Sequence, residues 1–335
     1  MYPGAYSEWG CFVKANAIPL VALFEKKMRL EVPLFQRPYV WSEEQQWAPL
    51  WEDIERKFGD YLEGRQDVPV HFLGAIVLDQ KQTPATHVER RLVIDGQQRL
   101  TTFQIFLNAF RDLCRASNAT ALADECANYT LNKGMMPDPK VDKYKVWPTQ
   151  LDRAAFVAVV ESGSPDDLKT RYPLKRQKWA RKPDPRPRLV DCYLYFYNQL
   201  EAFFKGSLGE LPLANDYPLD QRLEQCYQSL RNALMVVAID LEQGDDAQVI
   251  FETLNARGQA LLPADLLRNF IFLRATRHGE AAEKLYEEHW AGFDEAYWQE
   301  AVSQGRLNRP RSDLFMQHFL VSQQTVDIPI GHLYV

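Results

Sequence analysis

The fold prediction starts from residues 93–102, which read VIDGQQRLTT and change from a strand pattern to a helix pattern within a few positions. The β-branched residues before Asp95 favour a strand, and the Asp95-Gly96 pair is typical of a turn that ends one. Beyond this turn, large apolar residues recur at helical spacing up to residue 113, which predicts a deeply packed helix. Upstream, the apolar run at residues 72–78 predicts a second strand. Together these segments predict an α+β fold with a small mixed sheet and helices near the N-terminus.

Other segments extend this core in both directions. Residues 12–31 are predicted to form a short helix and its exit, and residues 32–41 an extended segment, because Pro38 disfavours helix at the residue before it. A helix is expected to begin at Ser42, with Ser42 and Gln45 forming a capping box. The remaining predicted elements are a strand at 234–241 and helices at 191–204, 245–255, 263–273 and 280–320. The chain after residue 115 is therefore expected to be a mainly helical region.

Composition limits the classes of protein that this chain can represent. Its 335 residues carry 45 acidic and 39 basic side chains, a formal charge of −6, so bulk charge cannot hold it on nucleic acid and any such contact needs a local patch. The five cysteines are far apart and show no metal-ligand spacing, which argues against a disulfide framework or a zinc site. Neither a signal peptide nor an apolar run of spanning length is present. We expect a cytoplasmic protein without a membrane partner.

The strongest candidate site is the strand-to-helix turn itself. A helix N-terminus attracts anions through its free N–H groups and its dipole. Arg99 could add a forked donor for a phosphate, and Asp95 could hold Mg²⁺ or orient a water molecule. The other polar or glycine positions of this turn are Gly96, Gln97, Gln98, Thr101 and Thr102. The alternative is that Asp95 only caps the helix and the rest is a solvated first turn.

A second block, residues 35–41, combines aromatic, amide and guanidinium groups on a stiff extended segment. Such a surface could stack on bases or sugars and contact a phosphate at the same time. Its candidate DNA-binding residues are Phe35, Gln36, Arg37, Pro38, Tyr39 and Trp41. The alternative is that Tyr39 and Trp41 are core anchors and that Arg37 pairs with a carboxylate.

A third block, residues 251–269, contains a helix end, a glycine turn and a new helix start. Asn255 and Arg257 belong to the turn, and Asp265 lies in the first turn of the next helix, so all three could approach a ligand. The alternative is an ordinary helical hairpin in which Asp265 favours the helix dipole.

A basic, proline-rich stretch at residues 169–188 holds nine cations against the single Asp184. This pattern favours a loop that contacts DNA phosphates on an otherwise acidic protein. The residues with the strongest claim to such contacts are Lys175, Arg176, Lys178, Arg181 and Lys182. The alternative is a solvated loop that contacts no partner.

Taken in order, residues 36–41, 72–77, 95–102 and 251–269 resemble the DGQQR family, the N-terminal domain of GmrSD-type restriction systems that act on modified DNA. The resemblance covers about residues 15–275. It implies a ParB/sulfiredoxin-like core in residues 1–115, with residues 116–335 as a helical region that completes the site. It also implies binding and hydrolysis of a nucleoside triphosphate (GTP or ATP) with Mg²⁺, through Asp95, Gln97, Gln98 and Arg99.

In relatives, hydrolysis is coupled to sensing of modified phage DNA and to a nuclease, and the SspE-like branch responds to phosphorothioate DNA. A phosphorothioate sulfur would suit an apolar hollow beside cationic donors, such as Phe35, Pro38 and Tyr39 beside Gln36 and Arg37. The six histidines show no HNH-type cluster, so we expect the nuclease domain to be absent from these residues, either removed or carried by another chain.

The resulting hypothesis is an NTPase and modified-DNA sensor of an antiphage restriction effector. Two alternatives remain open: a nucleotide- or DNA-binding module without turnover, and a ParB-like nuclease that cuts DNA directly. Assembly into a homo-oligomer also remains open.

Overall fold

The computed structural model describes residues 14–34, 36–65, 67–174, 185–205, 218–241, 263–304 and 307–324. Its contacts divide the chain into two compact units. The first comprises residues 1–32 and 38–245, and the second comprises residues 33–37 and 246–335.

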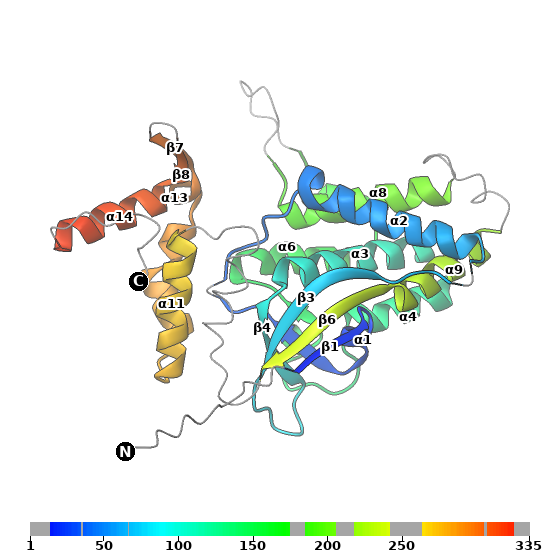
Figure 1. The fold of residues 1–335 in the computed structure, drawn as a ribbon, viewed down its shortest axis with the longest axis horizontal. Helices are drawn as coiled ribbons and strands as arrows, with labels where there is room; N and C mark the ends of the chain where they lie inside the picture. Colours follow the sequence, from blue (N-terminus) through cyan, green and yellow to red (C-terminus); the bar gives the residue numbers. More distant parts are fainter. Residues whose placement is uncertain are drawn as a thin grey trace, which may run out of the picture. The chain divides into compact units, whose positions relative to one another are not determined.

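A six-stranded mixed sheet organises the first unit, in the order β1-β6-β3-β4-β2-β5 (Figure 1). Its strands are β1 (Lys14–Pro19), β2 (Met28–Glu31), β3 (His71–Gln80), β4 (Glu89–Asp95), β5 (Val146–Trp147) and β6 (Leu234–Leu241). The β1/β6 and β3/β4 pairs are antiparallel, whereas β3/β6, β2/β4 and β2/β5 are parallel. The predicted combination of a mixed sheet with many helices is confirmed. Because β5 and β6 come from residues after 116, the sheet is not confined to the first 115 residues.

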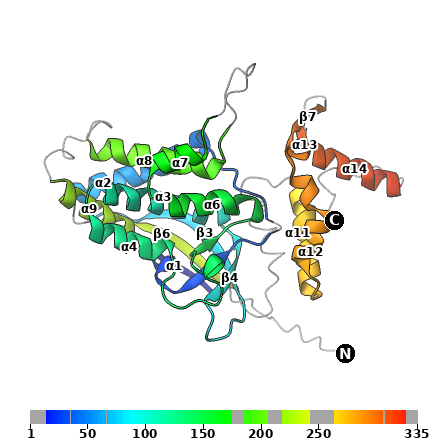
Figure 2. The same cartoon turned by 180° about the vertical axis from the view of Figure 1, so that it is seen from behind.

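Helices cover one side of this sheet, as the two opposite views show (Figures 1 and 2). They are α2 (Ala48–Leu62), α3 (Gln97–Ala116), α4 (Thr120–Thr130), α6 (Gln150–Ser162), α7 (Pro165–Arg171), α8 (Arg188–Phe204) and α9 (Leu219–Asn232). The burial pattern of β6 agrees with helices on one face of the sheet. Leu234, Val236 and Ala238 are buried, while Met235 and Val237 between them are partly exposed. Alternate side chains of a strand point to opposite faces, so the second face is the less covered one.

Helix α3 forms the centre of the helical layer. The sequence predicts a helix over residues 100–113. The structure confirms this helix as α3, which extends beyond the predicted range at both ends, from Gln97 to Ala116. Its side chains are buried almost without interruption from Leu100 to Cys114, including the charged pair Arg111 and Asp112. A helix that is buried on all sides must have neighbours on all sides, and α3 packs against α4, α6 and α8.

Two local predictions near the N-terminus need correction. The short helix expected within residues 12–31 is present as α1 (Ala22–Glu25), but the residues on either side of it form β1 and β2, because they gain backbone partners in the distant strands β6 and β4. At Ser42, the backbone N–H donates to Gln46 Oε1 at 3.0 Å, so Gln45 is not the capping partner. A π-helical turn, η1 (Glu43–Trp47), precedes α2 and brings the fourth residue, not the third, back to Ser42.

The second unit has a small core of its own. It contains α11 (Pro263–Arg277), α12 (Ala282–His289), the 3₁₀ turn η3 (Ala291–Asp294), α13 (Ala296–Gln299), the hairpin β7 (Ala301–Gln304) and β8 (Leu307–Pro310), and α14 (Arg311–Gln324). Phe272, Tyr286, Trp290 and Met316 pack together at its centre. The helix predicted from Pro263 is confirmed, whereas the hairpin interrupts the continuous helical pattern expected over residues 280–320. Of the helices that the structure describes, none is both long and apolar enough to cross a membrane.

Candidate nucleotide site at the β4–α3 junction

The candidate site is built where β4 ends and α3 begins. Asp95 is the last residue of β4 and pairs with Val77, which in turn pairs with Ile239 of β6. Asp95 is half-buried, and the β3/β4 register shifts directly beside it, between Val77 and Leu78, as at a β-bulge. Gly96 follows with φ +93°, and α3 then starts at Gln97 without a side-chain cap. This junction therefore combines a carboxylate with the N-terminus of a 20-residue helix.

Two glycines give this junction its shape. At Gly96, a Cβ atom would lie 3.0 Å from Ile76 Cγ1 and 3.1 Å from the carbonyl oxygen of Ala75. At Gly74, with φ +106°, a Cβ atom would lie 3.0 Å from Arg99 Cζ. The Arg99 guanidinium occupies the space left by Gly74, and its Nη1 donates to the Ala75 carbonyl. Arg99 is thereby held against β3 at the start of α3.

Gln98 has a different position from Asp95 and Arg99, because its side chain is buried against residues 38–40. Its Oε1 accepts the backbone N–H of Val40 at 2.9 Å, and its Nε2 donates to the Pro38 carbonyl at 3.1 Å. Both ends of the amide are therefore occupied by backbone groups. This geometry corrects the expectation that Gln98 contacts phosphate directly, and it makes Gln98 the clamp between the first two sequence blocks.

The clamp continues into a buried hydroxyl network around Tyr39. The Tyr39 hydroxyl lies 2.6 Å from Thr102 Oγ1 and 2.8 Å from the Trp47 indole nitrogen, which donates to it. Thr102 donates to the carbonyl of Gln98 at 2.8 Å, and the Tyr39 N–H donates to Asp152 Oδ2 at 2.8 Å. Burial is the main cause that raises the pKa of Tyr39 well above its ordinary value, so the phenol stays neutral.

This network overturns part of the DNA-binding prediction for residues 35–41. Tyr39 is 6 % exposed and its ring is a core anchor, so it offers no face on which a base could stack. Trp41 is half-buried and packs against the same core, which favours the structural alternative for both rings. Gln36 is buried and Arg37 half-buried in the second unit, and Phe35 lies outside the described residues.

The remaining predicted site residues are not brought to this junction by any described contact. Thr101 is buried at the helix start, so it does not reach solvent as a phosphate donor. Asp265 is in the second unit, where it forms an ion pair with Arg268 at 2.8 Å. The residues that lie outside the described part of the chain are Asn255, Arg257, Lys175, Arg176, Lys178, Arg181 and Lys182.

The residues that sequence reasoning missed are Gly74 and Ala75. The signal for Gly74 was present, since a glycine inside a strand pattern indicates a bulge or a close approach of another group. The β3/β6 register indeed shifts between Phe72 and Ala75. That Ala75 supplies a carbonyl to Arg99 could not be foreseen, because every residue type has the same backbone oxygen.

The donor set at the junction limits how a metal ion could be held. Across the described ranges, no group of three histidine, cysteine, aspartate or glutamate side chains is arranged to bind a metal. Mg²⁺ commonly uses only one or two carboxylates together with substrate phosphates and water. The half-buried carboxylate of Asp95 fits that mode and does not fit a closed protein cage.

We expect Gln98→Ala to loosen the clamp. The Val40 N–H and the Pro38 carbonyl would lose their partners, which should lower the free energy of unfolding by about 1–3 kcal/mol and speed hydrogen exchange at residues 38–41. Gln45→Ala is the matched control, because Gln45 is exposed and should change neither quantity. Denaturant unfolding and exchange mass spectrometry measure both, and equal protection in the two variants would contradict the clamp.

Comparison with known proteins gives one family. The model of the GmrSD restriction endonuclease, N-terminal domain, matches residues 20–272, which include the Asp95–Thr102 turn and the start of α11. A search of curated proteins finds no match. The match spans well over half of the chain and both sequence blocks that the clamp joins. The chain therefore belongs to the GmrSD restriction endonuclease N-terminal domain family, whose members have a role in restriction systems that act on DNA.

Proposed function

We propose that this domain binds a nucleoside triphosphate with Mg²⁺ at the β4–α3 junction, hydrolyses it, and couples turnover to the sensing of modified DNA. The observation that carries the proposal is the half-buried Asp95 carboxylate at the uncapped start of a 20-residue helix. Family membership gives this geometry its context, because a restriction system must link recognition of DNA to a controlled cut.

The phosphates would bind at the start of α3. Helix N–H groups and the positive end of the helix dipole favour an anion there. A guanidinium has five N–H donors, so Arg99 can be anchored to the Ala75 carbonyl and still bind phosphate oxygens. Anchoring also reduces the entropy that the arginine would lose on binding.

Asp95 would act on the attacking water or hold Mg²⁺ with the phosphates. When bound, Mg²⁺ neutralises the negative charge that develops on the phosphate oxygens during transfer of the phosphoryl group to water. Gln97 follows Asp95 closely in the chain and is half-buried, so it is the remaining candidate for orienting a phosphate. Gln98 is a positioning residue in this proposal, since its amide fixes residues 38–40.

The nucleoside would lie against the less covered face of the sheet. Val237 and Ile239 of β6 are partly exposed on this face, as is Ala75 of β3, the partner of Val237, whereas Val77 is fully buried and contributes no surface. An apolar surface next to an anion site suits a nucleoside polyphosphate, because the base at one end is largely apolar and the phosphates at the other end are charged.

Phosphorothioate DNA is the proposed trigger. Because Tyr39 is buried, the apolar hollow expected at residues 35–39 cannot include its ring, and the sulfur would have to be recognised elsewhere. The Tyr39 segment can still transmit binding, since it is hydrogen-bonded to the first turn of α3.

Asp95→Asn tests hydrolysis. We expect phosphate release from GTP or ATP with Mg²⁺ to fall by about 10²-fold, the usual effect of losing a general base or a metal carboxylate. Asp166→Asn is the matched control, because Asp166 is an exposed carboxylate on α7, where it pairs with Lys169 at 3.3 Å. It should stay within about twofold of wild type, as expected for a group outside the reaction.

The assay is run without DNA, with a plain duplex, and with the same duplex carrying phosphorothioate. Stimulation by the modified duplex alone supports coupling. Equal rates of phosphate release for wild type and Asp95→Asn would contradict a role of Asp95 in hydrolysis. Tight nucleotide binding without turnover would establish the binding-module alternative, and nicking of DNA by this chain with a divalent metal would favour the direct nuclease.

A further inference from the structure

A lysine-flanked loop on the first unit has no role in the proposed nucleotide site. The loop, residues 133–138, carries Met135 at its tip, and this methionine is 93 % exposed. Exposed lysines lie on the loop and on segments next to it: Lys133 on the loop, Lys140 on α5 (Pro139–Asp142), which follows the loop, and Lys26 and Lys27 after α1, where Lys27 contacts the loop. Within the described part of the chain, Lys26, Lys133 and Lys140 have no carboxylate within 4 Å. The exposed carboxylates nearest in sequence are Glu25 and Asp138.

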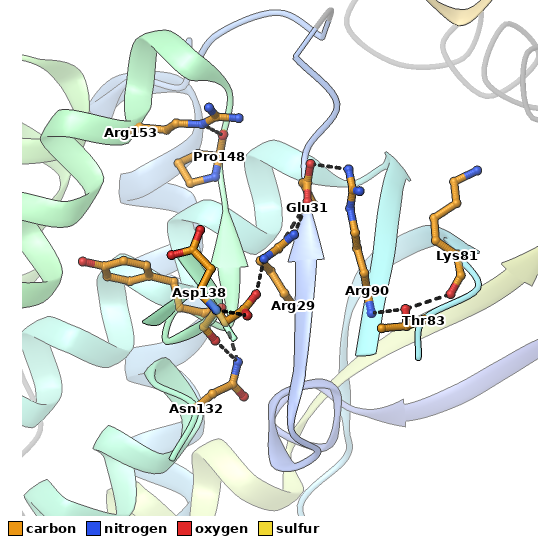
Figure 3. A network of polar contacts seen from close by, with 11 residues as sticks. Arg29, Glu31, Lys81, Thr83, Arg90, Asn132, Asp138, Pro148 and Arg153 are labelled. Carbon is orange, nitrogen blue, oxygen red and sulfur yellow. Dashed lines mark hydrogen bonds and ion pairs between the residues drawn. The ribbon is translucent and has the colours of Figure 1, made fainter. Parts of the chain in front are cut away.

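The loop is fixed at both ends, as Figure 3 shows around Asn132, Asp138 and Arg29. At its start, buried Asn132 donates through Nδ2 to the carbonyls of Met28 at 2.9 Å and Asp142 at 2.8 Å. At its end, the Asp138 N–H donates to Asp142 Oδ2 at 3.1 Å, and Asp142 is ion-paired with Arg29. Arg29 also contacts Glu31 at 2.9 Å, which ties the loop to the sheet.

A further contact holds the tip. Lys27 Nζ donates to the carbonyl of Met135 at 2.6 Å, and Gly134 has φ +88°, which lets the chain turn just before the methionine. The methionine is therefore presented to solvent by a braced loop. Among the described residues, Met135 is the most exposed of the large apolar side chains, so it is available to a partner.

We propose that this loop contacts duplex DNA, with Lys26, Lys133 and Lys140 on phosphates and Met135 as a wedge at a base step. Lysines supply the sequence-independent phosphate contacts of DNA binding. Apolar side chains such as methionine are inserted between base steps by proteins that bind the minor groove. The choice of DNA as the partner depends on the restriction role of the family, whereas the surface itself does not depend on nucleotide hydrolysis.

Two variants separate the parts of this surface. The triple variant Lys26→Ala/Lys133→Ala/Lys140→Ala should weaken binding of a fluorescent duplex by roughly tenfold or more and reduce the slope of log K against log salt by about 0.9 per lost contact. Met135→Ala should weaken binding without changing that slope, because its contact is not electrostatic. Lys27 is left intact, since it braces the loop.

The matched controls remove three cations and one apolar side chain at other positions of the protein surface. Arg56→Ala/Lys205→Ala/Lys284→Ala loses three exposed cations, and Leu151→Ala truncates an apolar side chain that is also exposed. Both should bind the duplex as wild type does. A 2-aminopurine base placed in the duplex should brighten with wild type and not with Met135→Ala, as unstacking requires.

The proposal is overturned by equal losses in the lysine variant and its control, by unchanged binding in Met135→Ala, or by no binding of any duplex by wild type. Stronger binding of an acidic peptide than of the duplex would assign the surface to a protein partner and overturn it as well. Phosphate release without DNA should be unchanged in every loop variant, so failure here is distinguishable from failure of the proposed hydrolysis.

Discussion

Asp112→Ala should lower the free energy of unfolding by about 3–5 kcal/mol, the largest effect that we expect from a single substitution in this chain. Asp112 and its neighbour Arg111 lie on α3 with almost no exposed side-chain surface. Arg111 Nε donates to Asp112 Oδ1 at 2.7 Å, and Nη2 donates to Oδ2 at 3.1 Å. Without the carboxylate, the guanidinium would remain charged and buried without its counter-ion.

The size of the effect follows from how many elements meet at this pair. Tyr193 of α8 donates its hydroxyl to Asp112 Oδ2 at 2.8 Å, and Arg111 Nη2 donates to the carbonyl of Val160 in α6 at 3.0 Å. Burial is the main cause that raises the pKa of Tyr193 far above its usual value, so its hydroxyl remains a donor. Removal of Asp112 therefore leaves donors from two elements without an acceptor.

Denaturant unfolding of two further variants tests this explanation. Asp166→Ala breaks an exposed ion pair with Lys169 and should cost less than about 1 kcal/mol. Arg111→Met with Asp112→Leu removes both charges and should recover most of the loss, because the penalty comes from the unpaired ion. A double variant as unstable as Asp112→Ala would show that packing, and not charge, sets the effect.

The local sequence pattern predicted those helices and strands whose own residues carry the apolar periodicity and turn signals. Strand β6 matches the expected residues 234–241, and α3 and α11 begin within a few residues of their predicted starts. Within residues 14–31 the pattern indicated the short helix α1 but missed β1 and β2, because these strands are short and are stabilised by partners more than 50 residues away. Pairing of distant strands has no local signature, and tertiary context overrides weak propensity there.

The candidate site shows the same division. The sequence predicted the turn at Asp95 and Gly96 and the helix start after it, because an Asp-Gly pair after a strand is typical of a turn. The sequence could not separate Gln97 from Gln98, because it does not reveal which of two adjacent amides meets residues 38–40. The Arg111–Asp112 pair was detectable in principle, as two adjacent charges in a helix whose apolar pattern predicts deep packing.

The second large effect should appear at Gly96, where Gly96→Ala is expected to cost roughly 3 kcal/mol of unfolding free energy. Part of the cost is conformational, since φ +93° is strained for any residue with a Cβ atom. The rest is steric, because the new Cβ would lie 3.1 Å from the Ala75 carbonyl oxygen and 3.2 Å from Ile76 Cα. Both are backbone atoms of β3 and cannot move without disturbing the sheet.

Gly74 and Gly163 separate the two contributions. Gly163→Ala isolates the conformational part at about 1 kcal/mol, because its φ is +71° and no atom lies within 4 Å of the new Cβ. At Gly74 the three atoms nearest to the new Cβ all belong to the Arg99 guanidinium group, so the steric part of the Gly74→Ala loss should disappear in an Arg99→Ala background. The loss at Gly96 should persist in that background, since its neighbours are backbone and Ile76 atoms. A double-mutant cycle measured by denaturant unfolding gives these couplings, and no coupling between Gly74 and Arg99 would mean that the guanidinium does not occupy the space beside β3.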